Sequence, residues 1–298
     1  MRLLNTQTLK VDLFMGQTIP AYAALSHTWG DEEVSLQDMQ STPPRTAEGF
    51  RKVEEACRVA RSDGYDYVWI DTCCIDKTSS AELSEAINSM FRWYQDADVC
   101  YAYLVDLPPE TEAALGDALP TCKYFTRGWT LQELIAPQDV HFYDSTWALR
   151  GSRRALVDLI SEITSIEIEV LLDADELYCV PVATKMSWAS KRVTTRIEDI
   201  AYCLLGLFDI NMPLLYGEGR KAFRRLQEEV MRKTNDLSLL AWVGGTPGEE
   251  IREIWARSPA DLRPVQRRTR DHQQGSAHLY AAAGGERPRY ERGQTSFS

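Results

Sequence analysis

The sequence has no long apolar run of the kind that a membrane-spanning helix requires. No window approaches the roughly 18 consecutive apolar residues of a span. The N-terminus, MRLLNTQTLKVDLF, is interrupted by polar residues and so does not have the apolar centre of a signal peptide. An excess of positive charge is also missing, because the formal net charge at pH 7 is −11. We therefore expect no membrane span and no general affinity for nucleic acid or anionic membranes.

Paired metal-ligand motifs are equally absent. The seven cysteines contain no CxxC pair and the four histidines no HxxxH motif, so we expect neither a zinc site nor another bound metal. Unpaired cysteines without a signal peptide indicate reduced thiols. What is present is ordinary globular composition, 44% hydrophobic and 26% charged over 298 residues. These features predict a soluble cytoplasmic protein.

Short apolar runs alternate with amphipathic stretches over the first half of the sequence. The runs have the length and composition of buried strands, at residues 22–26, 67–70, 99–105 and 140–143. The stretches carry apolar side chains at helical spacing, at residues 48–62 and 82–95. This alternation predicts an α/β fold with a mostly parallel sheet flanked by helices, preceded by a short ribbon over residues 1–14.

The pattern becomes helical from about residue 150. We expect helices over residues 153–163, 183–191, 197–208 and 220–233, and a short strand over 239–243. Beyond about residue 262 no apolar periodicity remains, which predicts disorder. The chain is thus divided into an α/β core over 1–150, a helical extension packed on the core over 151–243, and a polar, disordered tail over 244–298.

Polar side chains follow the first two predicted strands where each strand ends. Ser26, His27 and Gly30 follow the first strand, and Asp71 and Asp76 follow the second. The carboxyl ends of parallel strands meet at one edge of a sheet, where α/β folds usually bind ligands. We therefore expect Ser26, His27, Asp71 and Asp76 to lie close together, along with Glu133 from the helix predicted further along the chain, although an ordinary exit from strand to loop would give the same pattern. The two aspartates have a further alternative, which is to hold their loop by accepting backbone hydrogen bonds.

Trp129 and Glu133 lie four residues apart within FTRGWTLQELIAP (125–137), on one face of a predicted helix. A carboxylate beside a tryptophan is either structural, as a loop cap or the partner of Arg127, or chemical, facing a developing positive charge. Taken alone, Glu133 favours the structural role.

Two further chemistries use residues of the same edge. Cys74, His27 and Asp71 would form a nucleophilic site if they met in space, although a cysteine after a strand is more often a small buried hydrophobe. Glu133 paired with Asp71 or Asp76 would resemble the carboxylate pair of a retaining glycosidase. Sequence spacing tests neither arrangement.

Four segments resemble the fungal heterokaryon-incompatibility (HET) domain and occur in that family's order. They are YAALSHTWG (22–30), WIDTCCIDK (69–77), FTRGWTLQELIAP (125–137) and RIEDIAYCLLGLFDINMPLLYGEGRKAFRRLQEEV (196–230). SLLAW (238–242) and ARSPADL (256–262) resemble the segment that follows the domain. The resemblance implies an effector of regulated cell death in fungal allorecognition, acting when incompatible cells fuse.

HET domains are distantly similar to TIR domains, so the resemblance also implies a flavodoxin-like core and a reaction. In TIR enzymes, the helix that corresponds to residues 125–137 carries a glutamate that helps to cleave NAD between nicotinamide and ribose. By motif, the resemblance implies that Glu133 would be the catalytic residue, that NAD would be the substrate and that no cofactor would be needed. The implied substrate-binding residues are Ser26, His27, Trp29, Gly30, Asp71, Cys74, Asp76, Arg127 and Trp129.

The alternative is a non-enzymatic module that self-associates, or binds a partner signalling protein, and triggers death by proximity. The two hypotheses require different geometry. An enzyme needs Glu133, Ser26 and Asp71 to line one concave pocket, whereas a scaffold needs Glu133 buried in a salt bridge or capping a loop. Both treat residues 196–230 as helical core and support, with Glu198 and Asp199 in ion pairs at a helix end.

Overall fold

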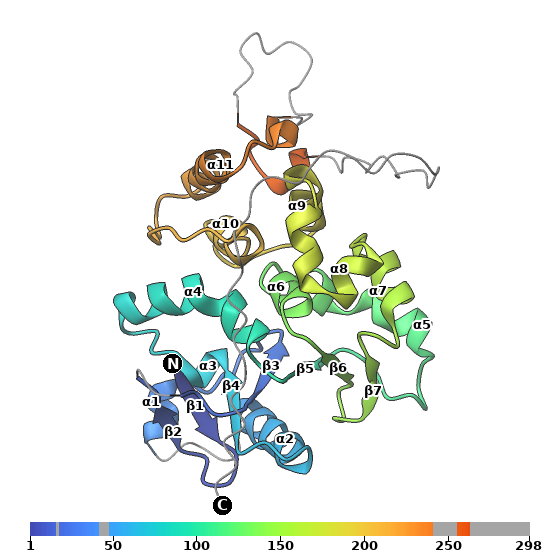
Figure 1. Ribbon diagram of the computed structural model, residues 1–298. Helices are drawn as coiled ribbons and strands as arrows, with labels where there is room; N and C mark the ends of the chain where they lie inside the picture. Colours follow the sequence, from blue (N-terminus) through green and yellow to red (C-terminus); the bar gives the residue numbers. More distant parts are fainter. Residues whose placement is uncertain (16–17, 42–47, 241–254, 263–298) are drawn as a thin grey trace, which may run out of the picture. The chain divides into compact units, whose positions relative to one another are not determined.

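The computed structural model describes residues 1–15, 18–41, 48–240 and 255–262. A seven-stranded sheet in the order β2-β1-β4-β3-β5-β6-β7 organises them (Figure 1). The strands are β1 (Arg2–Asn5), β2 (Val11–Leu13), β3 (Ala23–His27), β4 (Tyr67–Ile70), β5 (Val99–Tyr103), β6 (Val140–Tyr143) and β7 (Leu149–Ser152). β4, β3, β5 and β6 are parallel, and the other three strands pair antiparallel. The predicted α/β fold with a mostly parallel sheet is confirmed.

The four parallel strands have a flavodoxin-like order. Numbered along the chain, they lie in the order 2-1-3-4, so the order reverses between β3 and β5. Ligands of doubly wound α/β folds bind beside such a reversal, in the crevice at the carboxyl ends of the strands. Ser26 and His27 end β3, which places both residues at the carboxyl edge of the sheet beside this reversal.

The helices of the first half agree closely with the sequence pattern. α2 (Glu48–Ser62) occupies the predicted range, and α4 (Ser80–Gln95) begins after Ser79, whose side chain accepts a hydrogen bond from the Glu82 amide. α6 (Thr130–Ile135) contacts both β3 and α4. The described residues of this half also form three short α-helices, α1 (Leu36–Gln40), α3 (Asp71–Cys74) and α5 (Leu115–Ala118), and two 3-10 turns, Leu119–Thr121 and Lys123–Phe125. Asp71 therefore begins a helical turn directly after β4.

Each of the four helices expected in the second half has a counterpart, namely α7 (Val157–Thr164), α9 (Val182–Trp188), α10 (Asp199–Tyr202) and α11 (Lys221–Lys233). A further helix, α8 (Ile168–Leu172), was not predicted. The continuous helix predicted over 197–208 is wrong, because α10 ends at Tyr202 and a 3-10 turn, Gly206–Phe208, follows. That turn approaches α4 so closely that a Cβ on Gly206 would lie 2.1 Å from the Phe91 Cβ.

The predictions for the C-terminal part of the chain are either wrong or concern residues that the structure does not describe. The strand predicted over 239–243 is wrong for its first two residues, which belong to a 3-10 turn, Leu237–Leu240, while 241–243 lie outside the described residues. The predicted disorder of the tail concerns residues that are mostly outside them as well. Among the described residues, no helix combines the length and apolar character needed to cross a membrane.

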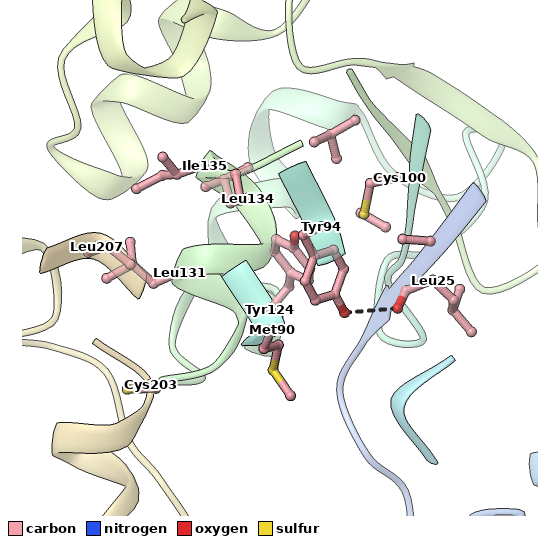
Figure 2. Packing of buried hydrophobic residues seen from close by; sticks show 14 of the residues in the cluster. Leu25, Met90, Tyr94, Cys100, Tyr124, Leu131, Leu134, Ile135, Cys203 and Leu207 are labelled. Carbon is pink, nitrogen blue, oxygen red and sulfur yellow. Dashed lines mark hydrogen bonds between the residues drawn. The ribbon is translucent and has the colours of Figure 1, made fainter. Parts of the chain in front are cut away.

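The core packs α6 between the sheet and the second half of the chain. Figure 2 shows Tyr94 and Tyr124 between α6 and the strand that carries Leu25, and Leu131 on the side of Cys203 and Leu207. The Tyr94 hydroxyl donates a hydrogen bond to the Leu25 carbonyl at 3.0 Å. Glu133 thus belongs to a helix that is packed on both sides, which fixes the position of its side chain.

Candidate functional site

A cavity of about 300 Å³ lies at the carboxyl end of β3. Residues from α3, α4 and α6 line it together with residues from the segment 195–216. Six of the residues singled out from the sequence face it, namely His27, Trp29, Asp71, Arg127, Trp129 and Glu133. Of the residues expected to converge at this edge of the sheet, His27, Asp71 and Glu133 line the cavity.

Glu133 forms part of the buried wall of this cavity. Its side chain is on α6, and the residue is 6% exposed. Its Oε2 lies 2.5 Å from the Ser26 Oγ, which is also 3.1 Å from the Tyr124 hydroxyl. Ser26 is fully buried and is not among the lining residues. Ser26 therefore holds the carboxyl group in place, and Glu133 and Asp71 line the pocket without it.

Burial raises the pKa of Glu133 to about 8, and the negative charge of Asp71 acts in the same direction. Hydrogen bonding by Ser26 opposes the shift without cancelling it. At neutral pH the carboxyl is therefore mostly protonated. Within the described part of the chain Glu133 has no ion-pair partner, and Arg127 instead donates a hydrogen bond to the Thr195 hydroxyl at 3.2 Å. The salt bridge between Glu133 and Arg127 that a scaffold would use is not formed.

Asp71 fixes one side of the cavity through Trp29. The Trp29 indole N–H donates a hydrogen bond to the Asp71 Oδ2 at 2.9 Å, and the Lys77 ammonium lies 3.7 Å from the centre of the Trp29 ring. Trp29 is nevertheless 52% exposed. A cation–π contact and a hydrogen bond together hold an aromatic face where a ligand would meet it.

His27 is supported by a carboxylate that the sequence did not indicate. The Nε2 of His27 lies 3.6 Å from the Glu33 Oε2, and the Lys52 ammonium lies 2.5 Å from the Glu33 Oε1. Burial alone would raise the pKa of Glu33, but its interactions with His27 and Lys52 outweigh burial and lower it to about 2. Glu33 therefore stays ionised beside the imidazole, and it also accepts a hydrogen bond from the Gly30 N–H at 2.7 Å.

Residues 196–230 contribute directly to the site, so their prediction as support alone is wrong. Arg196, Asp199 and Tyr216 line the cavity. The Tyr216 hydroxyl donates a hydrogen bond to the Asp199 Oδ1 at 3.0 Å, and the Arg196 guanidinium lies 4.5 Å from the Tyr216 ring centre. Burial raises the pKa of Asp199, while hydrogen bonds from Tyr216 and Trp129 oppose that shift. Only the fold brings this group to the end of β3.

The ion pairs predicted for Glu198 and Asp199 are not formed within the described residues. The Glu198 Oε1 accepts hydrogen bonds from the amides of Gly217 and Gly219, at 2.8 Å and 3.0 Å. Both glycines have positive φ, a conformation that glycine adopts without strain. Glu198 therefore fixes the turn that presents Tyr216 to the cavity.

Three other residues of the predicted site do not line the cavity, namely Gly30, Cys74 and Asp76. The Cys74 Sγ is buried against the backbone of β4, 3.5 Å from the Ile70 nitrogen, as expected of a small buried hydrophobe. The Asp76 Oδ1 accepts hydrogen bonds from the Thr78 amide at 3.0 Å and the Thr78 hydroxyl at 2.6 Å, so it holds its loop. The glycosidase-like pairing therefore keeps only Asp71 as a partner for Glu133 in the cavity.

Two buried arginines hold the ends of α6, and neither was predictable from the sequence pattern. Arg192 donates to the Arg127 carbonyl at 2.7 Å and to the Thr130 hydroxyl at 2.9 Å, where α6 begins. Arg153 donates to four carbonyls where α6 ends, those of Leu134, Ile135, Pro137 and Gln138, at 2.6 Å to 3.2 Å. An arginine beside an apolar segment looks the same in sequence whether its side chain is buried or exposed.

The arrangement suits a ligand that combines a cationic ring with phosphate groups. Glu133 and Asp71 supply carboxyl groups, Trp29, Trp129 and Tyr216 supply aromatic surface, and basic groups line the same cavity, from Lys77, Arg127 and Arg196. In the part of the chain that the structure describes, no group of three or more His, Cys, Asp or Glu side chains is placed to hold a metal ion.

Comparisons with known proteins identify two matching families and one curated relative. The family model described as heterokaryon incompatibility protein (HET) matches residues 22–118, and a domain of unknown function (DUF8212) matches residues 221–284. Vegetative incompatibility protein HET-E-1 of Podospora anserina is 48% identical over 220 residues, which are 71% of this chain and 16% of that protein. The chain thus spans about a sixth of the relative, and the HET model ends before Glu133. No solved structure matches.

Proposed function

Because this chain belongs to the heterokaryon-incompatibility (HET) domain family, we propose that it acts in vegetative incompatibility as an effector of regulated cell death. We propose further that the cavity at Glu133 hydrolyses the bond between nicotinamide and ribose in NAD. One observation carries this second step. Glu133 is a buried carboxyl with a raised pKa and no ion-pair partner among the described residues, and it lines a cavity at the reversal of strand order. Such groups cluster at functional sites.

The reaction requires only one carboxyl group, whose role is to stabilise the positive charge that develops on the ribose. The C1′–N bond of NAD⁺ breaks and its electron pair passes to the nicotinamide nitrogen, which neutralises the pyridinium ring. The leaving group therefore needs no proton. The ribose becomes oxocarbenium-like, and a carboxylate beside it stabilises the developing charge. Water then bonds to C1′ and loses a proton, which gives ADP-ribose, nicotinamide and H⁺.

The protonation state of Glu133 is compatible with these reaction steps. In the empty cavity a protonated carboxyl avoids the cost of burying an unpaired charge. A pyridinium ring that enters the cavity brings a positive charge next to Glu133 and so favours its ionised form. The carboxylate is then present when the ribose cation begins to form. The substrate itself would produce the catalytic state of Glu133.

The remaining lining groups suit the rest of the substrate. A volume of about 300 Å³ is small for a complete dinucleotide, so the cavity would enclose the nicotinamide–ribose end. Trp29 and Trp129 offer aromatic surface to the ring. Arg127 and Arg196 would face the diphosphate, whose charge guanidinium groups bind well.

Expression in yeast of the wild type and Glu133→Gln tests the proposal. Glutamine keeps the size of the side chain but cannot carry the negative charge. We expect the wild type to lower cellular NAD and viability, and Glu133→Gln to do neither at equal protein level. Asp76→Asn, at a residue that holds a loop outside the cavity, should behave as the wild type. Death without loss of NAD would overturn hydrolysis and favour a module that signals by self-association.

A further inference from the structure

We propose a second ligand site in this chain, a cavity of about 270 Å³ lined by α4, α9, α11 and the 3-10 turn at Gly206–Phe208. It would bind a small organic anion, a carboxylate or phosphate group on an apolar body, with Lys185 as the counter-ion. No residue lines both this cavity and the one at Glu133. The inference therefore goes beyond the proposed function and does not depend on it.

Lys185 is the observation that points to a ligand. The residue is 8% exposed and its side chain lines the cavity from α9. Its ammonium has neither a hydrogen bond nor an ion pair with any described residue. The ammonium lies 5.6 Å from the centre of the Phe208 ring. Burying an unpaired ammonium is costly, and a bound anion would remove that cost.

The nearest acid does not neutralise Lys185. The Asp236 Oδ2 accepts a hydrogen bond from the Val182 amide at 2.7 Å, and its Oδ1 accepts one from the Ser238 amide at 2.8 Å. Burial lowers the pKa of Lys185 to about 8, and the charge of Asp236 only partly opposes this. Lys185 therefore remains largely protonated at neutral pH, and its positive charge is available to a ligand.

Charges elsewhere in the lining leave the cavity favourable to an anion. Lys233 is paired with Asp209, so those two charges largely cancel. Arg92 also lines the cavity, against a single remaining acid, Asp175. One buried cation and one exposed cation suit a small anionic group better than a polyanion.

The apolar part of the lining defines the rest of the ligand. Phe91 and Phe208 provide aromatic surface beside Lys185, and Leu177 and Ile210 provide aliphatic surface. An aromatic or aliphatic body of a few carbon atoms would fill this space while its anionic group meets the ammonium.

Ligand-observed ¹⁹F NMR with the full chain tests the site, using 4-fluorobenzoate and 4-fluorophenyl phosphate as anionic probes and 4-fluorobenzamide as the neutral control. We expect at least one anion to bind the wild type, and Lys185→Met to weaken its binding by about tenfold or more. Glu133→Gln, in the other cavity, should leave binding unchanged. Equal binding by the benzamide, no loss with Lys185→Met, or no binding of either anion at millimolar concentration would each overturn the site.

A folding control accompanies these measurements. Lys185→Met replaces an unpaired buried charge by an apolar side chain of similar length, so we expect its melting temperature to equal or exceed that of the wild type. If Lys185→Met does not fold, Arg92→Gln is tested in its place. Arg92 is exposed, so its substitution should disturb the fold little. Anion binding should then weaken about threefold, as for the loss of one exposed charge. Unchanged binding would overturn the site.

Discussion

Burial gives the Glu133 carboxyl an energetic cost that an exposed carboxylate does not have. Its pKa rises from 4.5 to about 8 on folding. The folded chain therefore keeps a proton that the unfolded chain has released. The contribution of the protonated group to stability is complete below about pH 4.5 and is lost as the pH rises through about 8. A functional carboxyl is thus maintained at the expense of stability at neutral pH.

We predict that Glu133→Gln gains stability over the wild type as the pH rises. The difference in free energy of unfolding between the two should grow by up to about 1.4 kcal/mol per pH unit between about pH 5 and about pH 8. Urea unfolding at several pH values measures it, with Glu85→Gln, at an exposed position of α4, as the matched control. A difference that does not change with pH would contradict the raised pKa.

The sequence pattern predicted those site residues whose positions are set by the local sequence. His27 and Asp71 were predictable because each follows an apolar strand, and the ends of parallel strands meet. Ser26 was placed correctly at the strand end. Side chains alternate in direction along a strand, however, so the Ser26 hydroxyl points to Glu133 and away from the cavity. Asp199 and Tyr216 were missed because only tertiary packing brings them to the end of β3.

At the scale of elements, α6 is short and depends on groups outside itself. It has six residues, and no side chain caps its N-terminus. Isolated helices of this length are unstable in water. Arg192 and Arg153, both from the second half of the chain, satisfy backbone carbonyls at its two ends. The position of Glu133 therefore depends on two arginines that do not face the ligand.

We predict that Arg153→Met lowers the free energy of unfolding by about 3 kcal/mol or more, because four carbonyls lose their donor and three of these hydrogen bonds are buried. Chemical denaturation measures the change. Arg154→Met, at the exposed neighbouring position, is the matched control and should change stability little. Equal effects of the two substitutions would show that Arg153 does not support α6.

Element boundaries were predictable where the periodic pattern and the turn chemistry agree. α2 and α4 have clear apolar stripes, and the serines before α4 supply its cap. The segment 200–208 is apolar throughout, so periodicity could not show where its helix breaks. The helix ends at Tyr202, and the 3-10 turn that follows packs Gly206 against Phe91, which is far away in the sequence. β7 was missed because LRGS carries no alternating apolar pattern.

At the scale of the whole molecule, the first and second halves of the chain build one site. Met1–Val265 forms one compact unit. Thr195, Arg196, Asp199 and Tyr216 complete a cavity whose other lining residues come from before residue 150. The boundary near residue 150 stays a prediction of the sequence. The α/β class was predictable from alternation, whereas the strand order 2-1-3-4 was not, since pairing is decided by tertiary contacts.

We predict that a chain of residues 1–150 does not form the native core alone. It lacks both arginines that hold α6 and the residues Cys203 and Leu207, which lie on the side of α6 toward Leu131 (Figure 2). Urea unfolding followed by near-ultraviolet circular dichroism should show a cooperative transition for the full chain and none for the fragment. A cooperative transition of the fragment would mean that its core is independent of the second half.

Release of nicotinamide from NAD by the purified chain tests the central claim most directly. The protein should be assayed at high concentration, to permit any self-association, with Glu133→Gln as the matched variant and urea unfolding as proof that both are folded. We predict equal amounts of nicotinamide and ADP-ribose from the wild type and at least about a hundredfold less from the variant. Release by both proteins at the same rate, or by neither, would contradict hydrolysis of NAD at Glu133.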